Sequence, residues 1–147
     1  LLNVGVSHYN DIIPIPEIFE KNADLLLYAT NNFVDEVYKQ RLFSDNYAVI
    51  MCKNHPLSQA PLTLDSYSYA QHVVISTNGI AETSIDRKLT RLGRSRRVVS
   101  AIPHFSLAPD SVANTALIIS SPTRLTGKVS SKYTFPQTHL TPYLKPT

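Results

Sequence analysis

Short polar segments follow two predicted strands in the middle of the chain, and their side chains could bind a small ligand. The first is Ser76-Thr77-Asn78-Gly79, which follows an apolar run beginning at His72. The second is Pro103-His104-Phe105, which follows the apolar run Arg97–Ile102. Small-molecule sites use a few placed hydroxyl and amide groups of this kind to bind carboxylates or carbonyls. We therefore expect a binding site here, with Phe105 as a wall, although core packing is the commoner role of a phenylalanine.

A second polar corner is predicted near the start of the chain. Ser7 and His8 end the predicted strand Leu2–Val6 and precede a predicted helix, where backbone N–H groups and the helix dipole favour an anion. A cap for that helix is the alternative role of Ser7. Tyr28 and Thr30 end a further apolar run and are candidates for lining a ligand site. Tyr28 is equally suited to a buried position with one satisfied hydroxyl.

No residue pattern predicts catalysis, a metal or a cofactor. The single cysteine, Cys52, has no base placed by a motif to activate it, so we expect a buried structural thiol. The histidines lack the spacing of metal ligands, and the scattered glycines cannot form a phosphate-binding loop. Glu82 and Asp86 share a helix face beside basic residues, which favours surface ion pairs over acid–base catalysis. The sequence therefore predicts a protein that is not an enzyme.

The elements that must position the central polar segments follow from hydrophobic periodicity. Between the two apolar runs, a helical face predicts a helix that ends at Gly93, and one of Ser76, Thr77 and Asn78 is expected to cap it. Strand, helix and strand in this order predict a βαβ unit with parallel neighbouring strands. In such sheets, ligands bind beyond the carboxyl ends of the strands.

The remaining elements are predicted from the same signals. Strands are predicted at Asp24–Thr30, where both faces should be buried, at Lys39–Phe43, Asn46–Cys52 and Thr115–Ser120, with a turn at Ser44-Asp45-Asn46. Helices are predicted at Asp11–Glu20, Thr63–Tyr67 and Phe105–Asn114, and from Pro122 to about Ser131. From Tyr133 onward the chain should be an extended, proline-punctuated tail.

The charge distribution argues against a broadly basic surface. The chain has 147 residues, one cysteine and a net charge of +3, with no apolar run long enough to span a bilayer and no signal-peptide pattern. Residues 86–97 hold six basic side chains against one acidic one, and the rest of the chain carries eight basic and ten acidic residues. Because no aromatic residue lies within the basic run, a solvated helix face is favoured over a nucleic-acid patch.

Six segments in order resemble the effector-binding domain of LysR-type transcriptional regulators. They are DLLLYAT, EVYKQRLFSDNYAVIMCKNHPL, TLDSY, HVVIS with the helix to LGRSRRVV, IPHFSLAP, and ALIISSPTRL. Together they extend from Asp24 to about Leu125. The resemblance implies an α/β, two-lobed fold like that of the type 2 periplasmic-binding proteins, with mixed sheets and helices on both faces.

The resemblance also implies a division of the chain and a site. Residues 1–36 would form a partial first lobe and crossover, residues 37–132 the second lobe, and residues 133–147 a tail returning toward the first lobe. A small-molecule effector would bind between the lobes. The candidate contacts are Ser7, His8, Tyr28, Thr30, Ser76, Thr77, Asn78, Gly79, His104 and Phe105. Relative to the family, elements expected before Asp24 and after Thr147 are missing, so the first lobe resembles a remnant.

Partners follow from the same resemblance. The effector would be a small organic acid or an aromatic compound, and the regulator a cytoplasmic homo-oligomer without membrane contact. DNA would be bound only through an N-terminal winged helix-turn-helix, which this chain does not include. Two alternatives stay open at this point: a stand-alone solute-binding protein of the periplasmic type, and a nucleic-acid binder acting through Arg87–Arg97, which would bind DNA in a salt-dependent manner.

Overall fold

The computed structural model describes residues 15–20, 23–27, 38–76, 79, 82–126 and 133–134. The chain divides into two compact units, residues 1–42 with Thr147, and residues 43–146. The boundaries at residues 36 and 132, drawn from the sequence, stay predictions. Among the described residues, no helix has the length and apolar character that crossing a bilayer requires.

The first unit contains the helix α1, Ile15–Glu20, inside the predicted helical segment. Pro16 lies in its first turn, where the missing N–H costs no hydrogen bond. The predicted strand at Asp24–Thr30 is wrong for its described part, since residues 24–27 form no strand and Leu25 and Leu27 are 78% and 72% exposed. A strand buried on both faces needs paired neighbours, and no strand occurs among the described residues of this unit.

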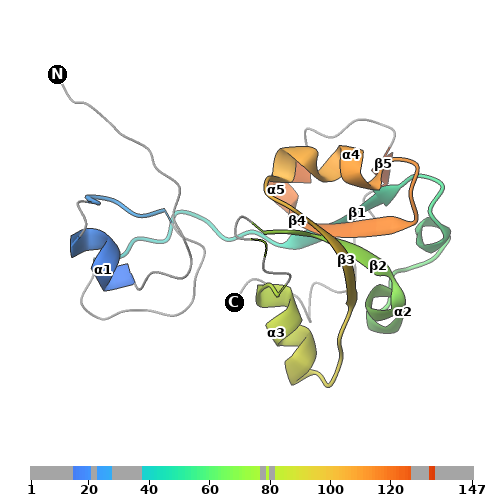
Figure 1. Cartoon of the computed structure of the whole chain (residues 1–147), viewed down its shortest axis with the longest axis horizontal. Helices are drawn as coiled ribbons and strands as arrows, with labels where there is room; N and C mark the ends of the chain where they lie inside the picture. The colour runs from blue at the N-terminus through green and yellow to red at the C-terminus, as the bar shows by residue number, and fades with distance from the viewer. Residues whose placement is uncertain are drawn as a thin grey trace. The chain divides into compact units, whose positions relative to one another are not determined.

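The second unit is built on one mixed sheet of five strands in the order β3-β2-β4-β1-β5 (Figure 1). The strands are β1 (Tyr47–Cys52), β2 (Gln71–Ile75), β3 (Arg97–Ile102), β4 (Leu117–Pro122) and β5 (Tyr133–Thr134). Strand β2 pairs in parallel with β3 and with β4, whereas β1 is antiparallel to β4 and β5. The parallel βαβ unit and the mixed sheet predicted from the sequence are confirmed.

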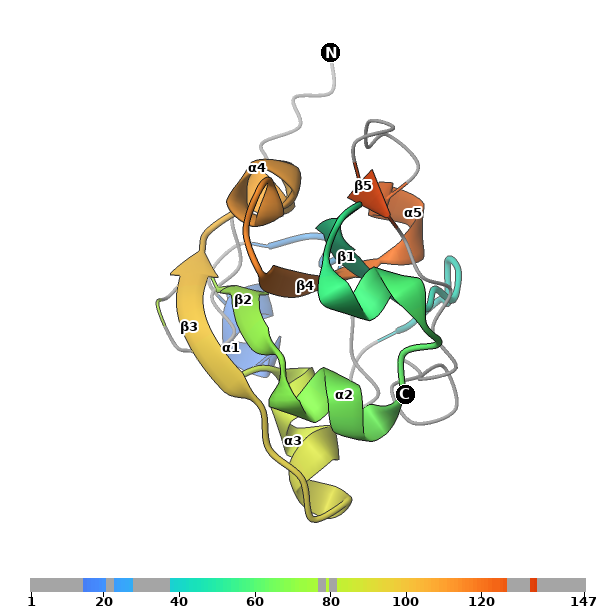
Figure 2. The same ribbon diagram turned by 90° about the vertical axis from the view of Figure 1, so that its right-hand side faces the viewer.

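Helices cover both faces of this sheet (Figures 1 and 2). On one face, α2 (Leu64–Tyr69) and α3 (Ser84–Arg91) contribute Tyr67, Ile85 and Leu89 to a buried cluster. On the other face, α4 (Ala108–Val112) packs its two buried residues against β1, β2 and β4. The described residues of this unit also form the 3-10 turns η1 (Pro56–Gln59) and η2 (Phe105–Leu107), and the helix α5 (Thr123–Thr126). The predicted placement of helices on both faces is confirmed.

The predicted strand at Lys39–Phe43 and the turn after it are wrong. Residues 39–43 are exposed and form no strand, and the neighbours of β1 in the sheet are β4 and β5. The guanidinium of Arg124 lies over the Phe43 ring at 4.2 Å from its centre. Asp45 forms no turn; its carboxylate accepts hydrogen bonds from the Thr123 hydroxyl and from the Arg124 N–H at the start of α5. Contacts with α5, rather than pairing with a strand, therefore hold Phe43 and Asp45 in place.

Local capping sets where the helices begin. The sequence suits either Thr63 or Asp65 as the cap of α2, and Thr63 is the cap, in a capping box with Ser66. The prediction that one of Ser76, Thr77 and Asn78 caps the next helix is wrong, because α3 is capped by Thr83. Thr83 and Asp86 form a capping box, in which each side chain satisfies N–H groups that the helix start leaves unpaired.

Gly93 ends α3 as predicted. Its φ of 66° is left-handed, and the N–H of Arg94 then reaches back to the Leu89 carbonyl at 2.8 Å. A side chain at this position would meet nothing within 4 Å, so substitution costs backbone strain alone. We expect Gly93→Ala to lower the free energy of unfolding by about 1–2 kcal/mol in urea denaturation. Gly93→Asn is the matched control and should cost less, because asparagine tolerates this conformation; equal losses for both variants would contradict this explanation.

Candidate functional site

The carboxyl ends of the parallel strands meet at one edge of the second unit. Ser76 follows β2, and its backbone N–H donates to the Ile102 carbonyl at the end of β3 at 2.9 Å. Ser120 lies near the same end of β4, which runs parallel to β2. The topology thus brings together the ends of all three strands, as the sequence predicts for two of them.

A small cavity of about 60 Å³ lies at this edge. Its lining combines β2 and Phe105 with polar groups from the start of α3 and from β4: Tyr47, Val73, Val74, Ile75, Thr83, Ser84, Ile85, Arg96, Phe105 and Ser120. A water needs about 10–15 Å³ of such space, so the cavity has room for a few waters or for a small functional group of a ligand. Apolar walls with a few polar groups match the usual composition of small-molecule sites.

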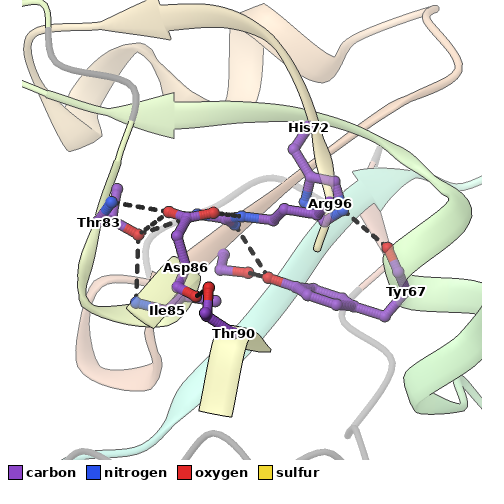
Figure 3. Close-up of polar contacts among 8 residues, drawn as sticks. Tyr67, His72, Thr83, Ile85, Asp86, Thr90 and Arg96 are labelled. Carbon is purple, nitrogen blue, oxygen red and sulfur yellow. Dashed lines mark hydrogen bonds and ion pairs between the residues drawn. The ribbon is translucent and has the colours of Figure 1, made fainter. Parts of the chain in front are cut away.

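A buried arginine, Arg96, lines the cavity, and its polar contacts are drawn in Figure 3. The Arg96 side chain is 1% exposed and binds the Asp86 carboxylate with two bonds, from Nε at 2.7 Å and from Nη2 at 2.8 Å. Nη2 also donates to the Thr83 hydroxyl at 2.9 Å, and Nη1 donates to the Tyr67 hydroxyl at 3.0 Å. Asp86 therefore compensates the guanidinium charge, which makes Arg96 a positioning group rather than a free cation.

The carboxylate of Asp86 is ionised at neutral pH. Partial burial acts to raise its pKa, but hydrogen bonds from Arg96 and Thr83, with the charge of Arg96, outweigh burial and lower the pKa to about 2. Burial likewise acts to lower the pKa of Arg96, and the Asp86 carboxylate reverses this and raises it. Both partners are thus held charged, which fixes the start of α3 against the segment that leads into β3.

Tyr67 connects this network to residues of β4 and β2. Its hydroxyl lies 2.8 Å from Ser120 Oγ, and its carbonyl accepts from His72 Nε2 at 2.7 Å. The Tyr67 and His72 rings meet edge to face at 4.6 Å between centres. Burial raises the pKa of Tyr67. Burial lowers the pKa of His72 to about 4, and the charge of Arg96 acts in the same direction, so this histidine is neutral at neutral pH.

Of the site residues predicted from the sequence, four are described in the structure and six are not. Phe105 lines the cavity and is half-buried. Ser76 is also half-buried, and it directly follows Ile75, which lines the cavity. His104 and Gly79 are exposed, and Gly79 has a φ of 74°. The others lie outside the described residues: Ser7, His8, Tyr28, Thr30, Thr77 and Asn78. Ligand contact by any of the ten stays a prediction.

Sequence reasoning missed the network and misplaced two of its members. The sequence predicts Arg96 in a solvated basic run and Asp86 in surface pairs with its basic neighbours. Both predictions are wrong, because the two side chains pair with each other and are only 1% and 19% exposed. Arg87 and Arg91 are exposed on α3, as predicted, and Arg94 is exposed in the loop beyond it. The spacing Thr83-x-x-Asp86 is a capping-box pattern, and it is the one signal in the sequence that locates part of the network.

Cys52 is half-buried rather than buried, which corrects the expectation of a buried thiol. Backbone N–H groups of Asn54 and Asn114 point at its sulfur and lower its pKa. Among the described residues, no three histidine, cysteine or acidic side chains gather in a geometry that could hold a metal ion.

The fold is that of an α/β lobe of the type 2 periplasmic-binding-protein-like class. Among solved structures, the regulatory domain of MexT, a transcriptional activator of Pseudomonas aeruginosa, matches with a TM-score of 0.62 at 20% identity, over 80% of this chain and 57% of that one. The BenM effector-binding domain with its effector benzoate matches with a TM-score of 0.58 at 13% identity, over 71% and 50%.

Sequence comparison gives the same relationship. The HTH-type transcriptional activator NahR of Pseudomonas putida is 28% identical over 70% of this chain and 34% of its own length. The activator NagR of a Ralstonia species is 30% identical over 75% of this chain and 37% of its own length. The chain therefore spans about a third of the length of these relatives. It matches no family model. These relationships confirm the resemblance to the effector-binding domain of LysR-type transcriptional regulators.

Proposed function

We propose that this chain is the ligand-sensing part of a LysR-type transcriptional regulator and binds a small-molecule effector at the carboxyl edge of β2, β3 and β4. The observation that carries the proposal is the cavity at that edge, which the start of α3 supplies with hydroxyl groups and Phe105 closes with an aromatic wall. The relatives are transcription activators, which favours a regulator over a solute-binding protein. The role proposed is sensing without catalysis.

The effector proposed is a small organic acid, aromatic or alicyclic. The cavity is the size of a carboxylate or hydroxyl group, and the Ser84 hydroxyl can hydrogen-bond to either. The Thr83 hydroxyl is already engaged by Asp86, Arg96 and the Ile85 N–H. Solved relatives of the same fold hold benzoate in BenM and shikimate in QuiR, both of this class. DNA binding and homo-oligomer formation in the cytoplasm are proposed for the whole regulator, and the helix-turn-helix in the relatives' names is the part that would contact DNA.

Thermal denaturation of the full chain against a panel of small acids, including benzoate and shikimate, tests the proposal. An effector should raise the melting temperature with concentration, since binding to the folded form alone adds about 2.7 kcal/mol at a hundred times the dissociation constant. Phe105→Ala should remove most of this rise. Leu107→Ala, a change at an exposed apolar residue of the same turn, is the control and should leave it intact. An effector rise that survives Phe105→Ala unchanged would place binding elsewhere.

A further inference from the structure

A groove larger than the cavity lies at the other end of the parallel strands, where β2 and β3 begin. Its volume is about 450 Å³, within the range of small-molecule sites. One wall is the end of α2, with Ser68 and Tyr69, and the other is the loop Gly93–Arg97 between α3 and β3. The groove therefore lies at the opposite end of these strands from the cavity at which the effector is proposed to bind, and Arg96 is the one lining residue that the two share.

The groove is positively charged. Arg96 is neutralised by Asp86, and Arg94 pairs with Asp65 at 2.7 Å in a contact whose side chains are 43% and 62% exposed. Exposed pairs of this kind contribute only about 0–1 kcal/mol, so a bound anion can compete for Arg94. Arg97 is exposed and forms no ion pair with any residue that the structure describes. One uncompensated guanidinium therefore stands at the groove wall.

An aromatic ring lies beside these arginines. Tyr69 is 84% exposed at the end of α2, and it lines the same groove as Arg94 and Arg97. The basic run itself contains no aromatic residue, which argued from sequence for a plain solvated surface. In the folded chain, Tyr69 of α2, which precedes the basic run in sequence, provides an aromatic ring beside it. Arginine and tyrosine together can stack on a planar group and pair with its charge.

A neighbouring hydroxyl lacks a partner. Ser68 Oγ is buried in the groove wall and has no hydrogen-bond partner among the described residues. Buried polar groups are rarely left unpaired, and an unpaired one costs about 1–3 kcal/mol. Because this oxygen has almost no accessible surface, a ligand in the groove would reach it only after the Ser68 side chain rotated toward the groove.

We propose that this groove binds a small aromatic anion, whose ring stacks on Tyr69 and whose carboxylate or phosphate pairs with Arg97. Planar, bidentate pairing with arginine suits either anionic group. The size of the groove and its single uncompensated charge favour a small ligand over a nucleic acid, which binds by engaging several phosphates at once.

Calorimetric titration of the full chain with adenosine monophosphate and with benzoate tests the proposal and separates the phosphate from the carboxylate. Saturable binding of at least one probe is expected, weakened about tenfold by Arg97→Gln through loss of a charged pair. Tyr69→Ala should weaken it too, whereas inorganic phosphate, which has no ring, should bind less well. Arg87→Gln removes an exposed charge of α3 outside the groove and is the control. Melting curves of each variant verify that it folds.

Three results would overturn the proposal. The first is no saturable binding of either probe, and the second is equal weakening by Arg87→Gln and Arg97→Gln, which would indicate only a general positive field. The third is tighter binding of a single-stranded oligonucleotide, with a salt dependence that corresponds to several phosphates. Repeating the titration in the Phe105→Ala background separates the two sites, because binding in the groove should persist there even where effector binding is lost.

Discussion

Arg96→Ala is expected to lower the free energy of unfolding by about 3–5 kcal/mol, the usual cost of removing one partner of a buried ion pair. The guanidinium is 1% exposed and Asp86 is 19% exposed, so the carboxylate would stay largely out of water without its cation. Tyr67 and Thr83 would each lose a charged donor at the same time. Urea denaturation of the full chain at neutral pH measures the loss.

Arg94→Ala provides the matched control for that substitution. It removes an arginine of the same loop whose pair with Asp65 is exposed, and it should cost about 0–1 kcal/mol. Replacing both Arg96 and Asp86 with apolar residues of similar volume should recover much of the loss, because no charge is then left buried and unpaired. If Arg96→Ala cost no more than Arg94→Ala, the network would not stabilise the fold.

The parts of the fold that the sequence predicted well are those with local causes. The short apolar runs of β2 and β3, the cap of α2 and the stop at Gly93 each depend on residues close in the chain. The parallel pairing of β2 and β3 then follows from the handedness and length of the connection. For the same reason, the position of Phe105 beyond the carboxyl end of β3 was predictable without coordinates.

The failures share a non-local cause. The apolar run at Asp24–Thr30 has the composition of a buried strand, but a strand needs partners that the run itself cannot specify. Arg96 lies in a charge run typical of a solvated face, and only the fold shows that Tyr67, 29 residues earlier, meets it. The same holds for the groove, since Tyr69 reaches the basic loop only after α2 and α3 pack on one face of the sheet.

Stability is expected to fall by about 3 kcal/mol as the pH is lowered from 6.5 to about 4, because of His72. The unfolded chain takes up a proton below pH 6.5, whereas the folded chain keeps this fully buried ring neutral until about pH 4. Protonation would place a hydrogen on Nδ1, which has no partner among the described residues, close to the charge of Arg96. The stabilising contribution is therefore complete above pH 6.5 and lost as the pH falls through this window.

His72→Gln isolates this effect, because its amide nitrogen can replace Nε2 as the donor to the Tyr67 carbonyl without titrating. A pH series of urea denaturation curves should show a much smaller decline between pH 6.5 and 4 for this variant than for the natural chain. His104→Gln changes an exposed histidine and should keep the decline. Asp86, whose pKa is lowered from 3.8 to about 2, contributes stability that is lost only below this window. A decline that persists in His72→Gln would therefore assign the pH dependence to other groups and contradict the neutral, buried state of His72.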